Sequence, residues 1–256
     1  MNKLLIERPA EHVALLRINR PEVRNALSFA LRERLAAELA RLDGDEGTRC
    51  IIIAGSEKSF AAGGDLKEQE GLGPVGMMLR GGGRAWDAIA ACRKPVIAAV
   101  RGYAFGGGFE LVLTTDMVIA GEGAVFALPE VRFGQLPGGG GTQRLARIVG
   151  KNLALELLLT GRSISSREAA RLGIVNRVTP DNEVDATAVA LASEIAAMAP
   201  LAVEQIKEVV LNGLDAPLHT ALLLERRAGQ VLYDSEDKHD GLRAFREKRS
   251  PKFKGR

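Results

Sequence analysis

The alternation of short apolar runs with amphipathic stretches is the feature that most limits how this chain can fold. Residues 13–18, 50–54 and 96–100 have the length and the β-branched composition of buried strands. Between the first two runs, Ser28 begins a stretch with four leucines on one helical face: Leu31, Leu35, Leu39 and Leu42. Strands separated by helices are typical of βαβ units around a parallel sheet, so the sequence predicts an α/β fold.

The second half of the chain is mostly helical in pattern. It predicts short helices and then longer ones, at 143–149, 153–160, 166–171, 184–198, 201–211, 217–233 and 235–248. Ser165 and Glu168 form a capping box before the third of these, and the one late strand signal is at 174–178. No repeat or low-complexity linker divides the chain. We therefore expect one structural unit, with a core over 1–195 and a helical C-terminal region over 196–256.

Composition and charge exclude two classes of protein. Hydrophobic residues make up 46% and charged residues 26% of the 256, which is typical of globular proteins and not of disordered ones. Lys and Arg number 35 against 32 Asp and Glu, a formal net charge of +3. Such a balanced surface disfavours a nucleic-acid partner, because that binding depends on neutralising phosphates. The densest basic run is the tail from Arg243 to Arg256.

The cysteines and the apolar runs bear on the compartment. Cys50 and Cys92 lie in or beside apolar runs without metal spacing, so we expect two buried free thiols in a reducing cytoplasm. No apolar run approaches the roughly 18 residues of a membrane span. The first twelve residues carry charges where a signal peptide needs an apolar core. The sequence thus predicts a cytoplasmic protein with no membrane anchor.

Several kinds of chemistry lack their motifs. None of the three histidines, His12, His219 and His239, has cysteines or acids at metal spacing. The chain has no GxSxG elbow, no GxxxxGK[ST] loop and no GxGxxG dinucleotide fingerprint. We therefore expect no metal and no cofactor, and we do not expect hydride transfer, P-loop phosphoryl transfer or serine-hydrolase chemistry.

Three glycine-rich turns remain, at 60–67, 106–108 and 137–142. The first two follow the strands at 50–54 and 96–100, and glycines there let a ligand approach unpaired backbone N–H groups. Two such turns at the ends of neighbouring parallel strands could direct two N–H groups at one oxygen. That arrangement is an oxyanion hole, suited to a carbonyl that becomes an enolate. The alternative is that each glycine only relieves a tight turn.

Two acids sit beside these turns in apolar surroundings. Glu110 falls in the first turn of the helix after Gly108, and Glu130 follows Leu128 and Pro129. A carboxylate among apolar residues is costly to bury unless it is used or paired. Taken singly, Glu110 could stabilise the helix dipole and Glu130 could be a surface turn acid. Together with the two turns, they suggest a carboxylate pair that handles one proton and one water.

The order and spacing of these segments resemble the crotonase family, and most closely its enoyl-CoA hydratases. The segments that carry the resemblance are 19–27, SFAAGGDLK at 59–67, 94–100, GGGFEL at 106–111, PEV at 129–131, 137–145 and the tail at 244–249. The resemblance runs from about residue 3 to 253. It implies a core that is a spiral of ββα turns, with a C-terminal helical region that mediates trimerisation, usually as a dimer of trimers.

The resemblance also implies roles for particular residues. Gly64 and Gly107 match the two oxyanion-hole amides, and Glu110 and Glu130 match the glutamates that hold the water and exchange the C2 proton. Gly138 matches the residue whose backbone helps to hold that water. Residues that match contacts to the CoA moiety are Val23, Arg24, Ala62, Leu66 and Lys67, with Phe245 and Lys248 from the tail at its nucleotide end.

Segment 71–86 occupies the region that lines the acyl pocket in the family. Its pocket candidates are Met77, Met78, Leu79 and Trp86, with ordinary core packing an equal alternative. The sequence also departs from the family at two positions. Gly64 stands where many hydratases have Ala, and Arg101 replaces a common Asn.

The implied activity is hydration of a trans-2-enoyl-CoA to the 3-hydroxyacyl-CoA by syn addition, with CoA as part of the substrate. The alternative is a crotonase that acts on a specialised acyl-CoA, such as a carnitinyl-CoA dehydratase. Isomerases, hydrolases and decarboxylases of the family mostly lose or move one glutamate. RNA binding and a non-catalytic scaffold are disfavoured, because the basic tail suits CoA phosphates and both glutamates are intact. We expect a homo-oligomer that binds an acyl-CoA thioester.

Overall fold

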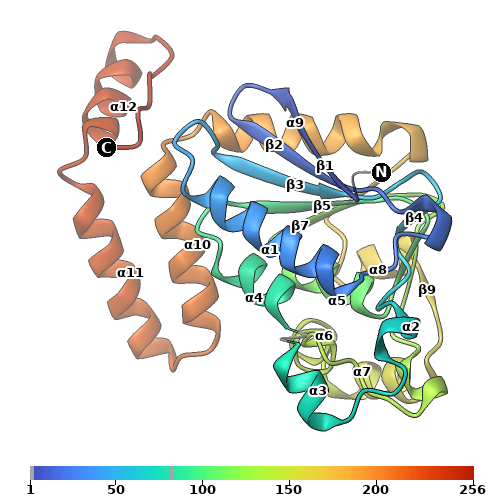
Figure 1. The fold of residues 1–256 in the computed structure, drawn as a ribbon. Helices are drawn as coiled ribbons and strands as arrows, with labels where there is room; N and C mark the ends of the chain where they lie inside the picture. Colours follow the sequence, from blue (N-terminus) through green and yellow to red (C-terminus); the bar gives the residue numbers. More distant parts are fainter. Residues whose placement is uncertain (1–2, 81–82) are drawn as a thin grey trace.

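The computed structural model describes residues 3–80 and 83–256. Its larger sheet has six strands in the order β1 (Leu4–Ala10), β2 (Val13–Ile18), β3 (Cys50–Ala54), β5 (Val96–Val100), β7 (Met117–Gly121) and β10 (Arg177–Thr179). β1 and β2 form an antiparallel hairpin, and the remaining neighbours pair in parallel. Helix α1 (Phe29–Asp43) covers one face and α9 (Val184–Ala196) the other (Figure 1). Because both faces are covered, every residue of β3 and β5 is buried.

A smaller sheet follows the larger one along the chain. Its strands are β4 (Ser59–Ala61), β6 (Tyr103–Phe105), β8 (Val125–Ala127) and β9 (Ile164–Ser165), and the first three pair in parallel. Each of β3, β5 and β7 therefore leads into a short strand of this second sheet and then into a helix. This ββα unit occurs three times in succession. The expected α/β spiral is confirmed.

The remaining helices fill the lower part of Figure 1 and the side of the core. They are α2 (Leu66–Gln69), α3 (Pro74–Leu79), α4 (Arg84–Ala91), α5 (Gly107–Thr114), α6 (Gly141–Val149), α7 (Lys151–Thr160) and α8 (Ser166–Arg171), with 3-10 turns at Pro21–Val23, Glu130–Phe133 and Asp181–Glu183. The Ser28 hydroxyl accepts a hydrogen bond from the Leu31 N–H, and the Ser165 hydroxyl accepts one from the Glu168 N–H. The four leucines of α1 are all buried, so both predicted helix starts and the predicted apolar face are confirmed.

Several expected boundaries were wrong. The late strand expected at 174–178 is β10 at Arg177–Thr179, since Ile174 and Val175 are buried in the turn that follows α8. A second late strand, β9, pairs with β8. Of segment 71–86, residues 81–82 lie outside the described residues.

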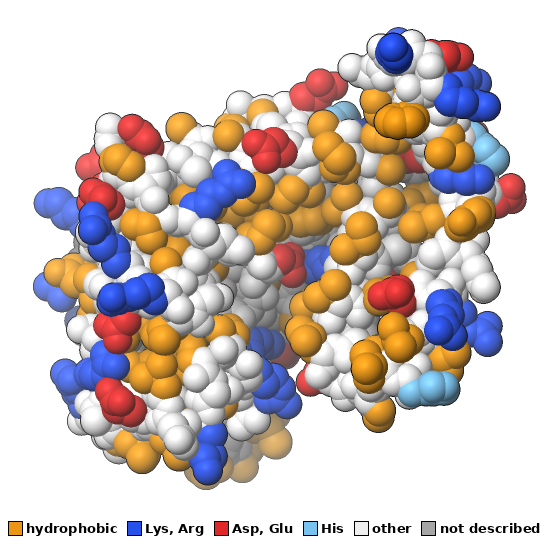
Figure 2. Space-filling model, turned by 180° about the vertical axis from the view of Figure 1, so that it is seen from behind, with side chains coloured by type: hydrophobic (Ala, Val, Ile, Leu, Met, Phe, Trp, Pro, Cys, Tyr) orange, Lys and Arg blue, Asp and Glu red, His pale blue; other side chains and the backbone are white. Residues whose placement is uncertain are grey.

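A helical arm of α10 (Pro200–Leu214), α11 (Leu218–Leu232) and α12 (Glu236–Glu247) extends from the core, as expected for the C-terminal region (Figure 1). The Lys207 ammonium ties α10 to the core, since Nζ lies 2.6 Å from an Asp116 carboxylate oxygen and 2.9 Å from the Lys94 carbonyl oxygen. Figure 2 shows hydrophobic side chains gathered on the arm and on the adjoining face of the core. On the arm, Leu214 and Leu218 are 79% and 74% exposed.

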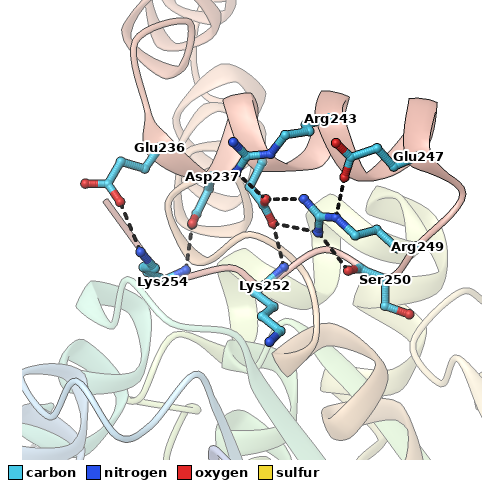
Figure 3. Close-up of polar contacts among 9 residues, drawn as sticks. Glu236, Asp237, Arg243, Glu247, Arg249, Ser250, Lys252 and Lys254 are labelled. Atoms are coloured by element: carbon cyan, nitrogen blue, oxygen red, sulfur yellow. Dashed lines mark hydrogen bonds and ion pairs between the residues drawn. The ribbon is translucent and has the colours of Figure 1, made fainter.

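The end of the chain folds back along α12 and returns to the core (Figure 3). The Asp237 carboxylate accepts hydrogen bonds from the Lys254 and Gly255 N–H groups at 2.6 and 2.8 Å. Asp240 pairs with the Arg249 guanidinium at 2.6 Å, and this hydrogen bond holds the pKa of Asp240 below its usual range. The Arg49 guanidinium then binds a backbone carbonyl of the tail, that of residue 253, at 2.9 Å.

Arg101, one of the departures from the family, has a structural partner. Its guanidinium lies 3.0 Å from an Asp185 oxygen, and Arg17 reaches the same oxygen at 3.1 Å. The pair of arginines thus joins the sheet to the start of α9. Cys50 and Cys92 are buried and free, which confirms the predicted burial of two free thiols. Within the described ranges no single helix is long and apolar enough to cross a membrane; one pair, bent by 106°, passes jointly by length and composition.

Candidate active site

A cavity of about 310 Å³ lies where the three glycine-rich turns meet. Its wall brings together the five residues expected at the reacting centre: Gly64, Gly107, Glu110, Glu130 and Gly138. The topology explains why they meet. β4, β6 and β8 are adjacent and parallel, and Gly64, Gly107 and Glu130 follow their carboxyl ends. The carboxyl ends of parallel strands lie at one edge of a sheet, where ligands bind in open α/β sheets.

The two glycine amides are directed at this cavity. The Leu27 N–H donates to the Gly63 carbonyl at 2.8 Å, and the Asp65 N–H donates to the Leu27 carbonyl at 3.4 Å. In this parallel pairing Leu27 bonds to the residues before and after Gly64, so the Gly64 N–H points away from Leu27. Gly64 lines the cavity on that side. Gly107 is the first residue of α5, where the N–H has no acceptor within the helix.

The two turns are also close together. A Cβ built on Gly63 would lie 3.7 Å from the Gly107 nitrogen. The Gly107 nitrogen therefore lies beside the turn that carries Gly64.

Glu110 is held by the third glycine-rich turn. Its side chain projects from the first turn of α5, and the residue is 3% exposed. One carboxylate oxygen, Oε1, accepts hydrogen bonds from the Gly139 and Gly141 N–H groups at 2.7 and 2.8 Å. Burial raises the pKa of Glu110, and the two N–H groups and the charge of Arg32 oppose that rise. The carboxylate is thus fixed in orientation while it lines the cavity.

Glu130 begins the 3-10 turn after β8 and is half-buried. Burial raises its pKa to about 7, and the negative charge of Glu110 contributes to that rise. Its Oε2 is buried with no hydrogen-bond partner among the described residues. Its Oε1 lies against Gly106, where a Cβ would be 2.9 Å away and where φ is +51°. Glycine at 106 therefore permits both the turn and the close approach of this carboxylate.

The acyl-pocket candidates divide into two pairs. Trp86 is 3% exposed and lines the cavity, with its indole N–H 3.3 Å from the Gly107 carbonyl oxygen, and Met77 also lines it. Met78 and Leu79 do not line the cavity, and they are 72% and 74% exposed. Both expectations for these two residues, a place in the acyl pocket or in the core, were therefore wrong.

Other residues of the cavity wall were missed from the sequence. They are Arg32, Gln69, Phe105, Pro129, Phe133, Gln135, Leu136 and Gly139. Arg32 carries the one sequence signal, since the residues three positions before and after it on the helix are the apolar and buried Phe29 and Leu35.

The expected CoA-contacting residues occupy two places. Arg24 and Ala62 line a second cavity of about 750 Å³ beside the first, together with Lys58 and Tyr103. Leu66 and Ala62 line the first cavity, so Ala62 joins the two. Val23 and Lys67 line neither cavity and are exposed.

The tail residues are elsewhere. Phe245 is 84% exposed on α12, and Lys248 caps the end of that helix. Figure 1 places α12 at the opposite end of the molecule from α2 and α3. One chain therefore does not bring its own tail to its own cavity. Within the described residues, no three acidic, histidine or cysteine side chains form a group that could hold a metal ion.

Residues 8–256 match the family described as enoyl-CoA hydratase/isomerase, and the chain belongs to this family of enzymes.

Relatives of similar length agree with this assignment. The chain is 43% identical over 253 residues to a probable enoyl-CoA hydratase of Rhizobium meliloti, covering 99% of this chain and 98% of the relative. It is 41% identical over 256 residues to the 2,3-dehydroadipyl-CoA hydratase of Escherichia coli, covering both chains fully (100% and 100%). The crystal structure of an enoyl-CoA hydratase from Bacillus anthracis superposes with a TM-score of 0.96 at 38% identity, covering 100% of each chain.

Proposed function

We propose that this enzyme adds water across the double bond of a trans-2-enoyl-CoA by syn addition, giving the 3-hydroxyacyl-CoA. The observation that carries the proposal is the meeting of Glu110, Glu130 and the Gly64 and Gly107 amides at one cavity. Water is a poor nucleophile, and C3 accepts it only when charge moves onto the thioester oxygen. The site needs donors for that oxygen and groups that move protons, and these four residues supply both.

The Gly64 and Gly107 N–H groups would bind the thioester oxygen and stabilise the enolate that forms. Backbone donors preorganised at a developing oxyanion contribute on the order of 10²–10³ in rate for each donor. The indole of Trp86, bonded to the Gly107 carbonyl at 3.3 Å, would help to keep the second donor in place.

Glu110 would orient the water and help to activate it for attack at C3. The two N–H groups on Oε1 favour the ionised form, which is the form that accepts a proton. The backbone of Gly138, on the same cavity wall, would help to hold that water.

Glu130 would exchange the proton at C2. A pKa of about 7 lets its carboxyl group both give and take a proton near neutral pH. The two carboxylates share one cavity, so their titrations are coupled and one holds a proton that the other lacks.

CoA would bind beside Arg24 and Ala62, in the second cavity. Leu66 and Lys67 would contact it from the start of α2, and Val23 from the outer edge. Phe245 and Lys248 would reach the nucleotide end from a neighbouring copy, because α12 of the same chain lies away from the cavity. The exposed apolar side chains of the arm support assembly as a trimer or a dimer of trimers.

The test is the hydration of crotonyl-CoA by the variants Glu110→Gln and Glu130→Gln. The reaction is measured as the loss of the enoyl absorbance. Each variant keeps the shape of the side chain and removes its basicity, so kcat should fall at least about a hundredfold with KM little changed. Exchange of the C2 proton with deuterated water should suffer most in Glu130→Gln. The control is Glu46→Gln, an exposed glutamate outside the cavity. A near-normal rate in either active-site variant would make that glutamate structural and refute the proposal.

A second candidate is a crotonase reaction on a specialised acyl-CoA, such as the dehydration of carnitinyl-CoA. The Arg32 guanidinium in the cavity wall favours an acyl group with a negative charge and disfavours the trimethylammonium group of carnitinyl-CoA, and the name of the Escherichia coli relative gives it a substrate with a second carboxylate. A panel of crotonyl-, crotonobetainyl-, aromatic and long-chain enoyl-CoAs separates the candidates by kcat/KM.

A further inference from the structure

An arginine is built into the wall of the reaction cavity. Arg32 belongs to α1, is 8% exposed and lines the cavity. Its guanidinium lies 5.2 Å from the Phe29 ring centre and 5.0 Å from that of Trp86. Its Nε donates a hydrogen bond to the Leu27 carbonyl at 3.0 Å. The aromatic contacts and this bond fix the position of the charged group.

The glycine at 64 makes room for this charge. A Cβ built on Gly64 would lie 2.8 Å from Nη2 of Arg32, and closer still to the side-chain amide nitrogen of Gln69. An alanine at this position would put its methyl group into that space. The guanidinium and the Gln69 amide therefore stand directly beside the turn that supplies an oxyanion-hole amide.

Acidic side chains surround the Arg32 guanidinium. Burial lowers the pKa of Arg32, and the charges of Glu110, Glu68 and Asp65 oppose that effect. Each of these acids also binds other groups. Glu68 accepts the Phe29 N–H at 2.6 Å, Asp65 pairs with Arg20 at 3.2 Å, and Glu110 accepts the two glycine N–H groups. A substrate carboxylate would add a further favourable contact, since a guanidinium binds carboxylates in a planar, two-point geometry.

We infer that Arg32, with Gln69 beside it, selects a short trans-2-enoyl-CoA whose acyl chain carries a second carboxylate. The inference rests on the proposed hydratase function and names its substrate class. A neutral chain of the same length would leave the buried guanidinium without that carboxylate. The second carboxylate would also be repelled by Glu110 and Glu130 in the same cavity, and the charge of Arg32 offsets that repulsion.

The test compares length-matched thioesters. Hydration of trans-2-glutaconyl-CoA is measured against its monomethyl ester and against pent-2-enoyl-CoA, and 2,3-dehydroadipyl-CoA against hex-2-enoyl-CoA. A charge-assisted pair in a buried site is expected to favour the carboxylate by at least about tenfold in kcat/KM. In Arg32→Met, which keeps the length of the side chain, the carboxylate-to-neutral ratio should fall by at least about tenfold, with a smaller fall in Arg32→Lys.

Arg80→Met is the matched control. Its guanidinium also faces the Phe29 ring, at 5.4 Å, but Arg80 does not line the cavity, so the ratio should not change. The wild-type comparison does not depend on whether any variant folds. Equal or better hydration of the ester and the neutral chains by the wild-type enzyme would overturn the inference while leaving the hydratase function standing.

Binding of saturated thioesters separates the two proposals. Glutaryl-CoA and pentanoyl-CoA cannot be hydrated, and their affinities are measured by calorimetry. If glutaryl-CoA binds more tightly than pentanoyl-CoA and Arg32→Met loses this preference, the inference is supported. That holds even if none of the enoyl-CoAs is hydrated. Absence of hydration would refute the hydratase function alone. Equal affinities for the two saturated thioesters would overturn the inference.

Discussion

Glu130→Gln should change how the stability of the protein depends on pH. The pKa of Glu130 rises from 4.5 to about 7 on folding, because the carboxyl group is buried beside Glu110. Between those values the folded chain keeps a proton that the unfolded chain releases, so the free energy of unfolding falls as pH rises and levels off above the folded pKa. A shift of this size corresponds to about 3 kcal/mol, and partial solvation of the side chain reduces the expected loss to about 2 kcal/mol.

The assay is denaturant unfolding of the wild type and Glu130→Gln at about pH 5 and about pH 8. The variant has no proton to lose at this position. From about pH 5 to about pH 8, its free energy of unfolding should therefore rise by about 2 kcal/mol relative to that of the wild type. Because the titrations of Glu110 and Glu130 are coupled, the difference between the two proteins reports the carboxylate pair, and burial of Glu130 is its largest cause. Glu46→Gln, at an exposed position, should follow the wild type. Wild-type and Glu130→Gln stabilities that run parallel with pH would refute the argument that burial holds a proton on Glu130.

Three further outcomes are expected. Gly139→Ala should lower kcat for crotonyl-CoA at least about tenfold, because its methyl would lie 2.6 Å from the Trp86 ring and 2.8 Å from Oε2 of Glu110, whereas Gly229→Ala, with nothing within 4 Å, should keep full activity. Lys248→Ala should raise KM with little change in kcat, since a phosphate contact is equal in the ground and transition states; a tenfold fall in kcat at unchanged KM would show this assignment to be wrong. Light scattering at micromolar concentration should give three or six copies, and a monomer would contradict the role given to the exposed arm.

The parts of the fold that local pattern determines could be predicted from the sequence. β2, β3, β5 and α1 have continuous apolar runs or a clear helical face, and their positions agree with the prediction. The three-residue strands β4 and β6 were not predicted, because strands so short are stabilised by pairing with distant segments, and no local alternation marks them. The short helices α2, α3 and α4 lie in a glycine-rich segment whose pattern is equally weak.

The same limit applies to the candidate site. Glu110 and Glu130 were identifiable because an acid in an apolar run is unusual, and the glycine turns beside them marked the backbone donors. Arg32 was missed because a charged residue in an amphipathic helix ordinarily faces solvent, and only the packing of Phe29 and Trp86 around it shows that it faces the cavity. The hold of the third glycine-rich turn on Glu110 joins groups about thirty residues apart, and no spacing rule predicts it.

The stacking of β4, β6 and β8 has a consequence for how this enzyme can vary. Each successive turn of the chain brings one part of the proposed reacting centre to the cavity: first the Gly64 amide, then the Gly107 amide with Glu110, and then Glu130. The separation of these groups is therefore set by the pitch of the backbone coil, and side-chain choice adjusts it little. A core substitution far from the cavity that changed this pitch by a fraction of an ångström would misalign donors and acids together. Activity should then be lost well before stability, while loops between turns can change freely and reshape the pocket around a fixed reacting centre.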